Sequence, residues 1–433
     1  MANIETLYQS YLKHPVICTD TRTISKDCLF FALKGDNFDA NTFAEQAIKD
    51  GAAFAIIDNA QYQLSEQCIL VDDVLTTLQE LARYHRNQLN IPVIGLTGSN
   101  GKTTTKELIK AVLAEKYRVF ATKGNLNNHI GVPLSILSMQ SDVEIAVIEM
   151  GANHQKEIEF LCEIAQPTHG LITNIGMAHL DGFGGFEGVK KGKAELYAYL
   201  KAHQGTTFIY KNNPYLMEMS ELATLDKVIY YGTDKENEIN GKLKNSDPLI
   251  EFEWEKNGKE SYEAKANLTG TYNFENILAA ICIGNFFQLS PIEINNGLAN
   301  YHPNNNRSQL TKTANNTVIC DFYNANPSSM AAALNNLKVL NAENKLAIIG
   351  DMFELGAAAP EQHENIVKQA ADHALSTLFI GNNFYAFKDQ YPGQFFNLPA
   401  DAAAYLKQHP IKDQLVLLKG SRGMALEQLL PLL

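Results

Sequence analysis

The chain contains 433 residues, of which 45% are hydrophobic, and carries a formal net charge of −12 at pH 7. This length exceeds what one hydrophobic core usually serves, so we expect two or three domains rather than a single small module. The acidic balance gives no broad attraction for nucleic acid, so we expect no nucleic-acid partner and local cations for any anionic ligand.

The first 90 residues predict a small α/β unit. Short apolar runs between residues 20 and 70 alternate with polar turns and with one helical stretch over 40–51. A second helical pattern covers 74–89 and stops before Pro92, which places a domain boundary near residue 90. The chain opens with no apolar core of signal-peptide length, shows no run long enough to span a membrane, and has six cysteines without metal spacing. We therefore expect a cytoplasmic protein without a membrane span.

The remaining residues predict two further α/β domains. Strand patterns recur from 91 to about 300, several followed by helical patterns, as in a largely parallel sheet. A polar stretch over 234–265 interrupts them with hairpin-like alternation. An asparagine-rich segment over 302–309 precedes four more strands with intervening helices, and a last helix is expected after the fourth of these strands. The expected fold class is α/β, with a small domain at 1–90, a central P-loop domain with a mostly parallel sheet at 91–310, and a Rossmann-like domain at 311–433. The joins near 90 and 310 are candidate hinges.

Residues 94–113, IGLTGSNGKTTTKELIKAVL, place a strand, a glycine turn and an amphipathic helix in succession. Glycines let backbone amides approach phosphate oxygens, a lysine supplies a cation, and a threonine hydroxyl can bind Mg²⁺. The segment fits T-G-x-x-G-K-T rather than the longer P-loop form, since Leu96 stands where that form begins with glycine. No guanine-reading N-K-x-D sequence follows, which favours ATP over GTP; a plain glycine turn is the structural alternative. The expected ATP contacts here are Gly98, Ser99, Asn100, Gly101, Lys102, Thr103 and Thr104, with Thr103 also on Mg²⁺.

Two polar residues follow later strands of the central domain. Glu149 ends the strand pattern VEIAVIEMG, at the carboxyl edge where open α/β sheets bind ligands, and its oxygens suit Mg²⁺. His179 follows the strand pattern LITNIG. A solvated edge carboxylate and a structural histidine are the alternatives for residues taken singly.

Eight motifs occur in a fixed order: LTGSNGKTTTKE, GNLNNHIGVP, EMGANHQKEI, TNIGMAHLDGFG, KGKAELY, YNANPSSM, GDMFELG and KGSRGMALE. Together they resemble the Mur ligases along the whole chain. Within that family, GNLNNHIGVP, MGANH, YNANP and GDMxELG look like the member that adds D-alanyl-D-alanine, whereas the D-N-P-R motif of many diaminopimelate-adding relatives is absent.

The resemblance implies an ATP-dependent ligase that joins D-alanyl-D-alanine to UDP-N-acetylmuramoyl-tripeptide through an acyl phosphate. The products would be ADP, phosphate and a precursor for peptidoglycan, and we expect a monomer. Another ligase of the superfamily, acting on folate or on an earlier muramyl peptide, is one alternative. A P-loop switch that hydrolyses ATP only to change shape is another.

The resemblance also implies roles for individual residues. It gives Lys102, His179 and Lys193 catalytic roles, and it places Mg²⁺ at Glu149, at His179 and at Lys193 carrying a CO₂-derived carbamate; Lys190 and Lys191 compete as carbamylation sites. Further ATP contacts are implied for Asn273, Asn276, Arg307, Asp321, Tyr323, Asn324 and Asp351. Helix capping would also explain the two asparagines, which lie one helical turn apart before an apolar run, and Asn306 replaces the usual hinge glycine. The UDP substrate is implied at Asp20, Thr21, Arg22, Lys34, Gly35, Asp39, Asn125, Asn127 and Asn128, and the acceptor at Asn326, Lys419, Ser421 and Arg422.

Overall fold

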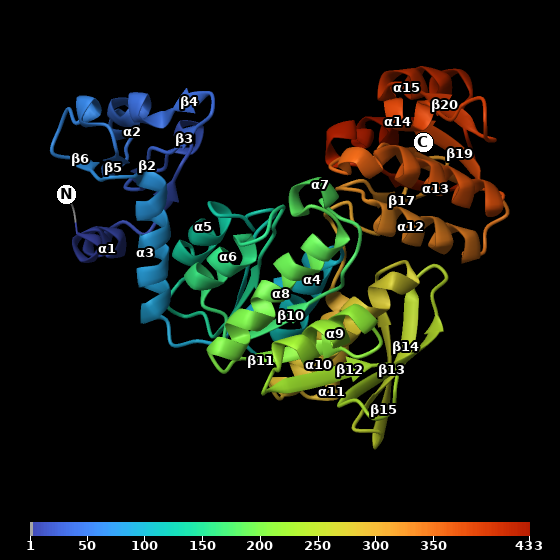
Figure 1. Cartoon of the computed structure of the whole chain (residues 1–433), viewed down its shortest axis with the longest axis horizontal. Coiled ribbons are helices and arrows are strands. Elements are labelled where there is room, and N and C mark those ends of the chain that lie inside the picture. Colours follow the sequence, from blue (N-terminus) through green and yellow to red (C-terminus); the bar gives the residue numbers. More distant parts are fainter. Residues whose placement is uncertain (1–2) are drawn as a thin grey trace.

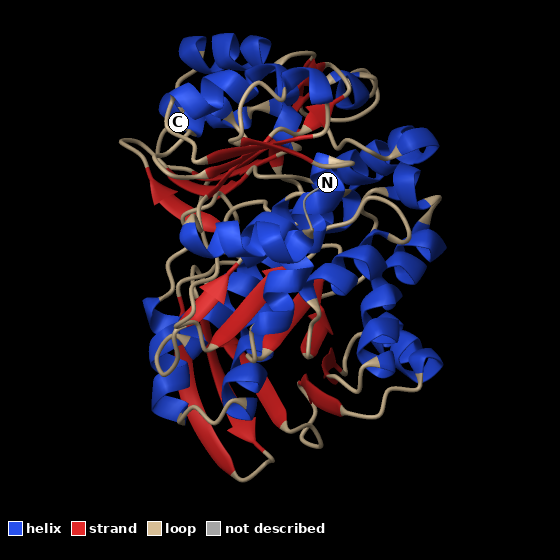
Figure 2. Cartoon of the chain, turned by 90° about the vertical axis from the view of Figure 1, so that its left-hand side faces the viewer, coloured by secondary structure: helices blue, strands red, loops and turns tan. Residues whose placement is uncertain are grey.

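The computed structural model describes residues 3–433 and contains three main sheets, each with its own helices. Figure 1 shows the amino-terminal and carboxyl-terminal parts on either side of a larger central part. Figure 2 shows strands flanked by helices, so each sheet buries its apolar faces under helical layers. The α/β fold with largely parallel sheets is therefore confirmed.

The amino-terminal part is built on a parallel sheet of four short strands, in the order β1-β2-β5-β6. All three residues of the central strand β2 are buried, which explains its continuous apolar sequence LFF. A two-stranded antiparallel ribbon, β3 with β4, lies beside the sheet. The elements are α1 (Ile4–Lys13), β1 (Ile17–Cys18), β2 (Leu29–Phe31), β3 (Lys34–Gly35), β4 (Phe38–Asp39), α2 (Ala44–Lys49), β5 (Phe54–Ile57), β6 (Cys68–Leu70) and α3 (Val74–Gln88).

The central part is built on a sheet of nine strands, in the order β15-β14-β13-β12-β11-β10-β7-β9-β8. Strands β8 to β13 pair in parallel, whereas β13, β14 and β15 pair antiparallel, as the alternating polar stretch predicts. The strands are β7 (Val93–Thr97), β8 (Val119–Ala121), β9 (Ile145–Glu149), β10 (His169–Ile172), β11 (Thr206–Tyr210), β12 (Val228–Gly232), β13 (Ile239–Asn245), β14 (Ile250–Lys256) and β15 (Glu260–Ala266). The helices are α4 (Lys102–Leu113), α5 (Gly131–Leu137), α6 (Glu157–Ala165), α7 (Leu180–Phe183), α8 (Phe186–Ala202), α9 (Pro214–Ala223), α10 (Phe274–Phe286) and α11 (Pro291–Asn300).

The carboxyl-terminal part has six strands in the order β16-β17-β21-β18-β19-β20, so the expectation of four strands was too low. The additional strands β16 and β20 lie at the two edges and have four and three residues, too few for a clear sequence pattern. A last helix was also expected after β21, but the chain forms 3-10 turns there, with Pro431 inside the final one. The elements are β16 (Gln309–Lys312), β17 (Thr317–Asp321), α12 (Pro327–Val339), β18 (Lys345–Gly350), α13 (Ala359–Asp372), β19 (Ser376–Ile380), α14 (Asn382–Tyr385), β20 (Gln394–Phe396), α15 (Pro399–Gln408) and β21 (Leu415–Lys419).

Helix α3 ties the amino-terminal part to the central part. Its buried side chains belong to a hydrophobic cluster that continues from the first sheet into the central one. The Arg86 guanidinium, also buried, donates to the carbonyl oxygens of Ala165 and Gln166, at 3.0 and 3.1 Å, where α6 ends. A cation at a helix carboxyl terminus is favourable, so this contact fixes α3 against the central part.

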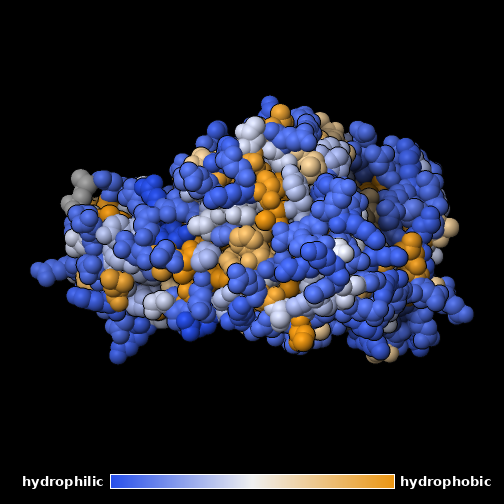
Figure 3. All heavy atoms as spheres, turned by 90° about the horizontal axis from the view of Figure 1, so that it is seen from below, coloured by the Kyte–Doolittle hydropathy of each residue, from blue (hydrophilic) through white to orange (hydrophobic). Residues whose placement is uncertain are grey.

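None of the helices in residues 3–433 is long and apolar enough to cross a membrane. The face in Figure 3 is mainly hydrophilic, with apolar residues in small separate areas.

Candidate active site

A cavity of about 1040 Å³ lies where the carboxyl ends of the central strands meet the carboxyl-terminal part. Open α/β sheets bind ligands at this edge. The cavity collects many of the residues expected in the site: Ser99, Asn100, Gly101, Lys102, Thr104, Asn125, Asn127, Asn128, Glu149, His179, Asn273, Asn276, Arg307, Asp321, Tyr323, Asn324, Asn326 and Lys419.

The phosphate loop has a shape that only glycine permits at two positions. Gly98 has φ +143°, and a Cβ there would lie 2.0 Å from the Thr173 hydroxyl oxygen. Gly101 has φ +78°, and a Cβ there would lie 2.7 Å from Asn276 Oδ1. Thr173 also donates to the Asn100 carbonyl oxygen at 2.6 Å, which holds the loop against β10. The tight turn therefore presents backbone amides at the start of α4, as phosphate binding requires.

Lys102 is the first residue of α4 and lies within the loop. Its ammonium donates to the carbonyl oxygens of Gly98 at 2.7 Å and Ser99 at 3.4 Å. The pKa of Lys102 is lowered to about 8, chiefly by burial; the Glu149 charge opposes this shift and the Arg307 charge adds to it. An arriving phosphate would favour the charged ammonium, so the loop provides a cation suited to that ligand.

Glu149 ends β9 with only 1% of its surface exposed. Its Oε1 accepts hydrogen bonds from the Thr103 hydroxyl at 3.3 Å and from Asn127 Nδ2 at 2.9 Å. Its Oε2 accepts no hydrogen bond from any residue of the described chain, although the buried Lys106 ammonium lies 3.8 Å away. A buried carboxylate oxygen without a donor is suited to a cation.

The oxygen donors around Glu149 fit Mg²⁺. Within residues 3–433, no three His, Cys, Asp or Glu side chains converge into a metal cage. Mg²⁺ commonly uses one or two carboxylates and takes its other oxygens from water and substrate phosphates. Glu149, with the Thr103 hydroxyl beside it, provides such a partial set next to the phosphate loop.

Lys193 lies in α8 with 2% of its surface exposed, just outside the cavity lining. Its ammonium has one hydrogen bond, to the Ala152 carbonyl oxygen at 3.4 Å, and lies 5.0 Å from the centre of the Phe183 ring. Burial, aided by the Lys102 charge, holds the pKa of Lys193 far below its ordinary value, against the opposite effect of Glu157 and Glu195. The side chain is therefore a buried amine with few partners.

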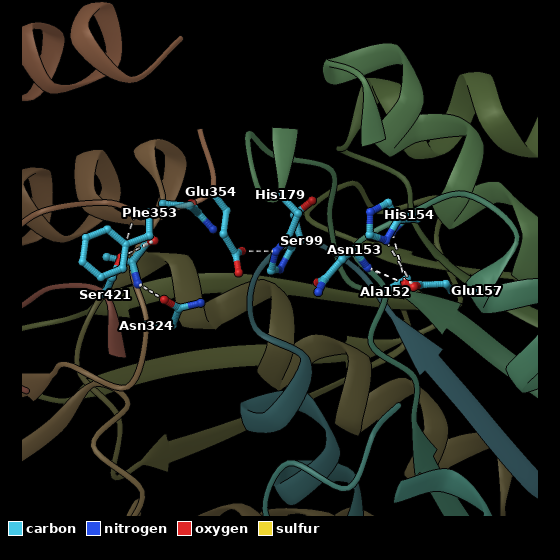
Figure 4. Close-up of polar contacts among 12 residues, drawn as sticks. Ser99, Ala152, Asn153, His154, Glu157, His179, Asn324, Phe353, Glu354 and Ser421 are labelled. Carbon is cyan, nitrogen blue, oxygen red and sulfur yellow. Dashed lines mark hydrogen bonds and ion pairs between the residues drawn. The ribbon is translucent and has the colours of Figure 1, made fainter. Parts of the chain in front are cut away.

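His179 lines the cavity and contacts the carboxyl-terminal part. Its Nδ1 contacts the Glu354 carboxylate, which reaches across from the loop after β18 (Figure 4). The hydrogen bond from His179 lowers the pKa of Glu354.

The loop between β9 and α6 also lines the cavity. Glu157 accepts hydrogen bonds from the amides of Asn153 and His154, at 2.6 and 3.1 Å (Figure 4). Sequence reasoning quoted this loop within EMGANHQKEI but assigned no role to Asn153, Gln155, Lys156 or Glu157, all of which border the cavity.

Asn273 and Asn276, at the start of α10, belong to a buried network. Asn276 accepts from the Thr105 hydroxyl at 2.9 Å and donates to Asn273 Oδ1 at 3.0 Å. Asn273 makes no side-chain capping bond, so helix capping does not explain it. Between them lies Glu275, whose pKa burial raises to about 7 despite a hydrogen bond from Asn174. Nothing in the sequence indicated the contact between Glu275 and Asn174, because the two residues are 101 positions apart in the chain.

Residues of the carboxyl-terminal part form the opposite wall. The buried Lys419 ammonium donates to Asp321 Oδ2 at 2.7 Å and to the Asn324 carbonyl oxygen at 3.4 Å. The Arg307 guanidinium lies 3.8 Å from the centre of the Tyr323 ring, a cation–π contact. These groups place fixed charges opposite the phosphate loop.

Two hydrogen bonds join that wall to the central part, the first at the phosphate loop and the second at the loop after β10. Asn326 Nδ2 donates to Asn100 Oδ1 at 2.7 Å, and the Met177 amide donates to the Ser328 hydroxyl at 3.0 Å. The two parts therefore meet directly at the cavity.

Three residues expected to face the site take other positions. Asp351 is buried outside the cavity lining, where its carboxylate accepts from the amides of Asn383 at 3.0 Å and Phe384 at 3.1 Å and so caps α14. Ser421 accepts from the Phe353 amide at 3.0 Å. Arg422 is exposed and lies 3.8 Å from Glu427. Their strand-end positions were as expected, but their side chains turn toward neighbouring loops.

The residues expected to bind the UDP substrate fall into two groups. Asn125, Asn127 and Asn128 border the cavity. The others belong to the amino-terminal part and are Asp20, Thr21, Arg22, Lys34, Gly35 and Asp39. Within this group Arg22 pairs with Asp20 at 2.6 Å, and Lys34 pairs with Asp58 at 2.7 Å.

Comparison with known proteins places this geometry in a family. The Mur ligase middle domain matches residues 96–284, and the Mur ligase glutamate ligase domain matches residues 306–422. A UDP-N-acetylmuramoyl-tripeptide–D-alanyl-D-alanine ligase of Bacillus subtilis is 35% identical, with 98% of this chain and 93% of the relative covered. The structure of MurF from Acinetobacter baumannii superposes with a TM-score of 0.87 at 30% identity, covering 96% and 92% of the two chains. The structure of MurF ligase from Thermotoga maritima in complex with ADP superposes with a TM-score of 0.86 at 26% identity, covering 97% of each chain. The chain belongs to the Mur ligase family.

Proposed function

We propose that this protein joins D-alanyl-D-alanine to UDP-N-acetylmuramoyl-tripeptide, using ATP. The observation that carries the proposal is one cavity that brings together a phosphate loop, a buried carboxylate and loops from both Mur ligase domains. The resemblance of the relatives along nearly the whole chain supports this member of the family in particular.

The first step must activate the tripeptide carboxylate, which is a poor electrophile. A carboxylate oxygen attacks the γ-phosphorus of ATP, the bond from that phosphorus to the bridging oxygen breaks, and ADP leaves. Lys102 and the amides at the start of α4 stabilise the charge that develops on the phosphoryl oxygens. Mg²⁺, held by Glu149 and Thr103, would neutralise further phosphate charge when bound.

The second step forms the amide. The amine of D-alanyl-D-alanine, after losing a proton, attacks the acyl carbon, and the carbon–oxygen bond to phosphate breaks. Asn326 and Lys419 lie in the wall opposite the phosphate loop and are proposed to hold the acceptor. Ser421 would act by fixing the nearby loop, and Arg422 would act at the rim. Positioning both substrates in one cavity supplies much of the rate.

The two groups of UDP-site residues suit a long substrate. We assign the nucleotide end to the residues of the amino-terminal part, and the end nearer the reacting carboxylate to Asn125, Asn127 and Asn128.

We also propose that the three domains divide near residues 90 and 310. We propose that the active form is a monomer.

Asn273, Asn276 and Arg307 are proposed to hold the rest of ATP. The two asparagines border the cavity next to the phosphate loop, where a Cβ at Gly101 would contact Asn276. Asp321, Tyr323 and Asn324 complete the same wall, and Asp351 would act only through the loop that it fixes.

Lys193 is proposed to carry the carbamate. Burial lowers its pKa and so favours the neutral amine, the form that attacks CO₂, and the product would place an anion next to the metal site. Lys190 is a poorer candidate, since its hydrogen bond to Glu218 raises its pKa and keeps it charged. Lys191 is exposed. Intact-protein mass spectrometry under CO₂ should show the added mass on wild type and not on Lys193→Ala.

The proposed function is tested by measuring ADP release while each substrate is omitted in turn. ADP should form only when UDP-N-acetylmuramoyl-tripeptide, D-alanyl-D-alanine and ATP are all present. Turnover with a single amino acid or with a folate substrate would favour another ligase of the superfamily. ATP hydrolysis without either peptide substrate would favour a switch protein.

A further inference from the structure

One contact between the central and carboxyl-terminal parts connects directly to the active site. Glu354, from the GDMFELG motif after β18, pairs with Nδ1 of His179, and His179 lines the cavity (Figure 4). The side chains of His179 and Glu354 remain 25% and 55% exposed. Because solvent screens such a contact, the pair contributes little to the stability of the fold.

The backbone around this contact is constrained on both sides. His179 has φ +53° and Glu354 has φ +62°, left-handed conformations that residues with a Cβ rarely adopt. The Asp181 amide donates to the Glu354 carbonyl oxygen at 3.4 Å, and a Cβ at Gly356 would lie 2.7 Å from Asp181 Oδ1. Strained residues that persist are held by their surroundings and often belong to functional sites.

Packing and hydrogen bonds hold the two sides of this contact in place. Leu180, next to His179, packs against the hydrophobic cores of both the central and the carboxyl-terminal parts. On the other side, the Ser421 hydroxyl accepts from the Phe353 amide and fixes the loop that carries Glu354. The pair thus forms between two supported loops.

We propose that Glu354 is a positioning residue that orients His179 for the metal site. A carboxylate that accepts the Nδ1 hydrogen selects one neutral tautomer, which leaves Nε2 with its lone pair as the nitrogen available to a metal. Metal-binding histidines commonly have such a carboxylate partner, and its removal typically costs 10–100-fold in metal affinity. Because Glu354 belongs to the carboxyl-terminal part, His179 is oriented only when that part is docked. The inference rests on the proposed ligase function and on the metal contact that the family resemblance implies for His179.

The test is Mn²⁺ binding, followed by electron paramagnetic resonance, with a non-hydrolysable ATP analogue present. Wild type is compared with Glu354→Ala, Glu354→Gln and His179→Ala. Glu361→Ala is the matched control, because this exposed glutamate lies in the first turn of α13, outside the cavity. Nucleotide affinity without metal is measured on every variant.

We expect Glu354→Ala to weaken Mn²⁺ binding by about 10–100-fold. Glu354→Gln should recover part of this loss, because its amide oxygen can still accept the Nδ1 hydrogen. Metal-free nucleotide affinity and the Glu361→Ala control should match wild type. Mn²⁺ affinity of Glu354→Ala within twofold of wild type, or an equal loss in Glu361→Ala, would overturn the inference.

The experiments distinguish a failure of the positioning role of Glu354 from a failure of the proposed ligase function. If His179→Ala weakens Mn²⁺ binding and Glu354→Ala does not, only the positioning role of Glu354 is wrong. If wild type fails to release ADP with the peptide substrates, the ligase proposal fails whatever the metal titration gives.

Discussion

Gly98→Ala should disable the phosphate loop. A Cβ at residue 98 would lie 2.0 Å from the Thr173 hydroxyl oxygen and 3.0 Å from the Thr173 backbone nitrogen. Because Thr173 directly follows β10, its backbone can move away only if β10 moves as well. Overpacking costs about 1–3 kcal/mol. The positive φ of +143° adds about 1–2 kcal/mol for a residue with a Cβ. If the loop shifts to relieve a total of about 2–5 kcal/mol, ADP affinity should fall by about 30-fold or more.

Isothermal titration of ADP into the folded variant measures this loss. Gly258→Ala is the matched control, because Gly258 also has a positive φ, +62°, but a Cβ there meets only the Lys235 carbonyl oxygen at an ordinary 3.7 Å. The control should lose about 1–2 kcal/mol of stability and no ADP affinity. If Gly98→Ala binds ADP within threefold of wild type, the steric reasoning about the loop is refuted.

Three further predictions concern buried charged groups. Wild type should gain stability from pH 8 to 10.5, where the unfolded chain retains the Lys102 proton that the folded chain loses. In urea unfolding, Lys102→Met should show a smaller gain than wild type, because Lys193 still contributes. Burial raises the pKa of Glu275 from 4.5 to about 7, so between these pH values the folded chain binds a proton that the unfolded chain has lost. The stability of wild type should therefore fall as the pH rises through this interval, and thermal unfolding of Glu275→Gln at pH 5 and 8 should lack this fall. Arg86→Ala should cost about 2–4 kcal/mol in urea unfolding, because three backbone carbonyls lose a buried cation, whereas exposed Arg83→Ala in the same helix should cost less than about 0.5 kcal/mol.

Local signals in the sequence predicted much of the fold. The strand, turn and helix around Gly98 and Lys102 are consecutive, so their hydrophobic periods and glycines identify them without knowledge of tertiary contacts. The alternation over 234–265 likewise predicted the antiparallel strands β13 to β15. Strands β8, β16 and β20 escaped notice because three or four residues cannot establish a period.

The site was predicted where its residues follow strands and missed where distant segments meet. Lys106 sits in a helix with the pattern of a partly exposed face, yet it is fully buried and donates to the Thr122 carbonyl oxygen at 2.6 Å. Glu354 was seen only as part of a motif, since its partner His179 lies in another part of the chain. Asp351 ends a strand as expected, but packing decided that its side chain caps α14. The sequence shows where a strand ends, whereas the direction of a side chain depends on its neighbours.

The central claim is that the γ-phosphoryl group passes to the tripeptide carboxylate before the amide forms. Tripeptide substrate labelled with ¹⁸O in that carboxylate tests this directly, with the released phosphate analysed by mass spectrometry. The account predicts one labelled oxygen in each phosphate molecule formed with the amide product. Unlabelled phosphate accompanying full amide formation would contradict it.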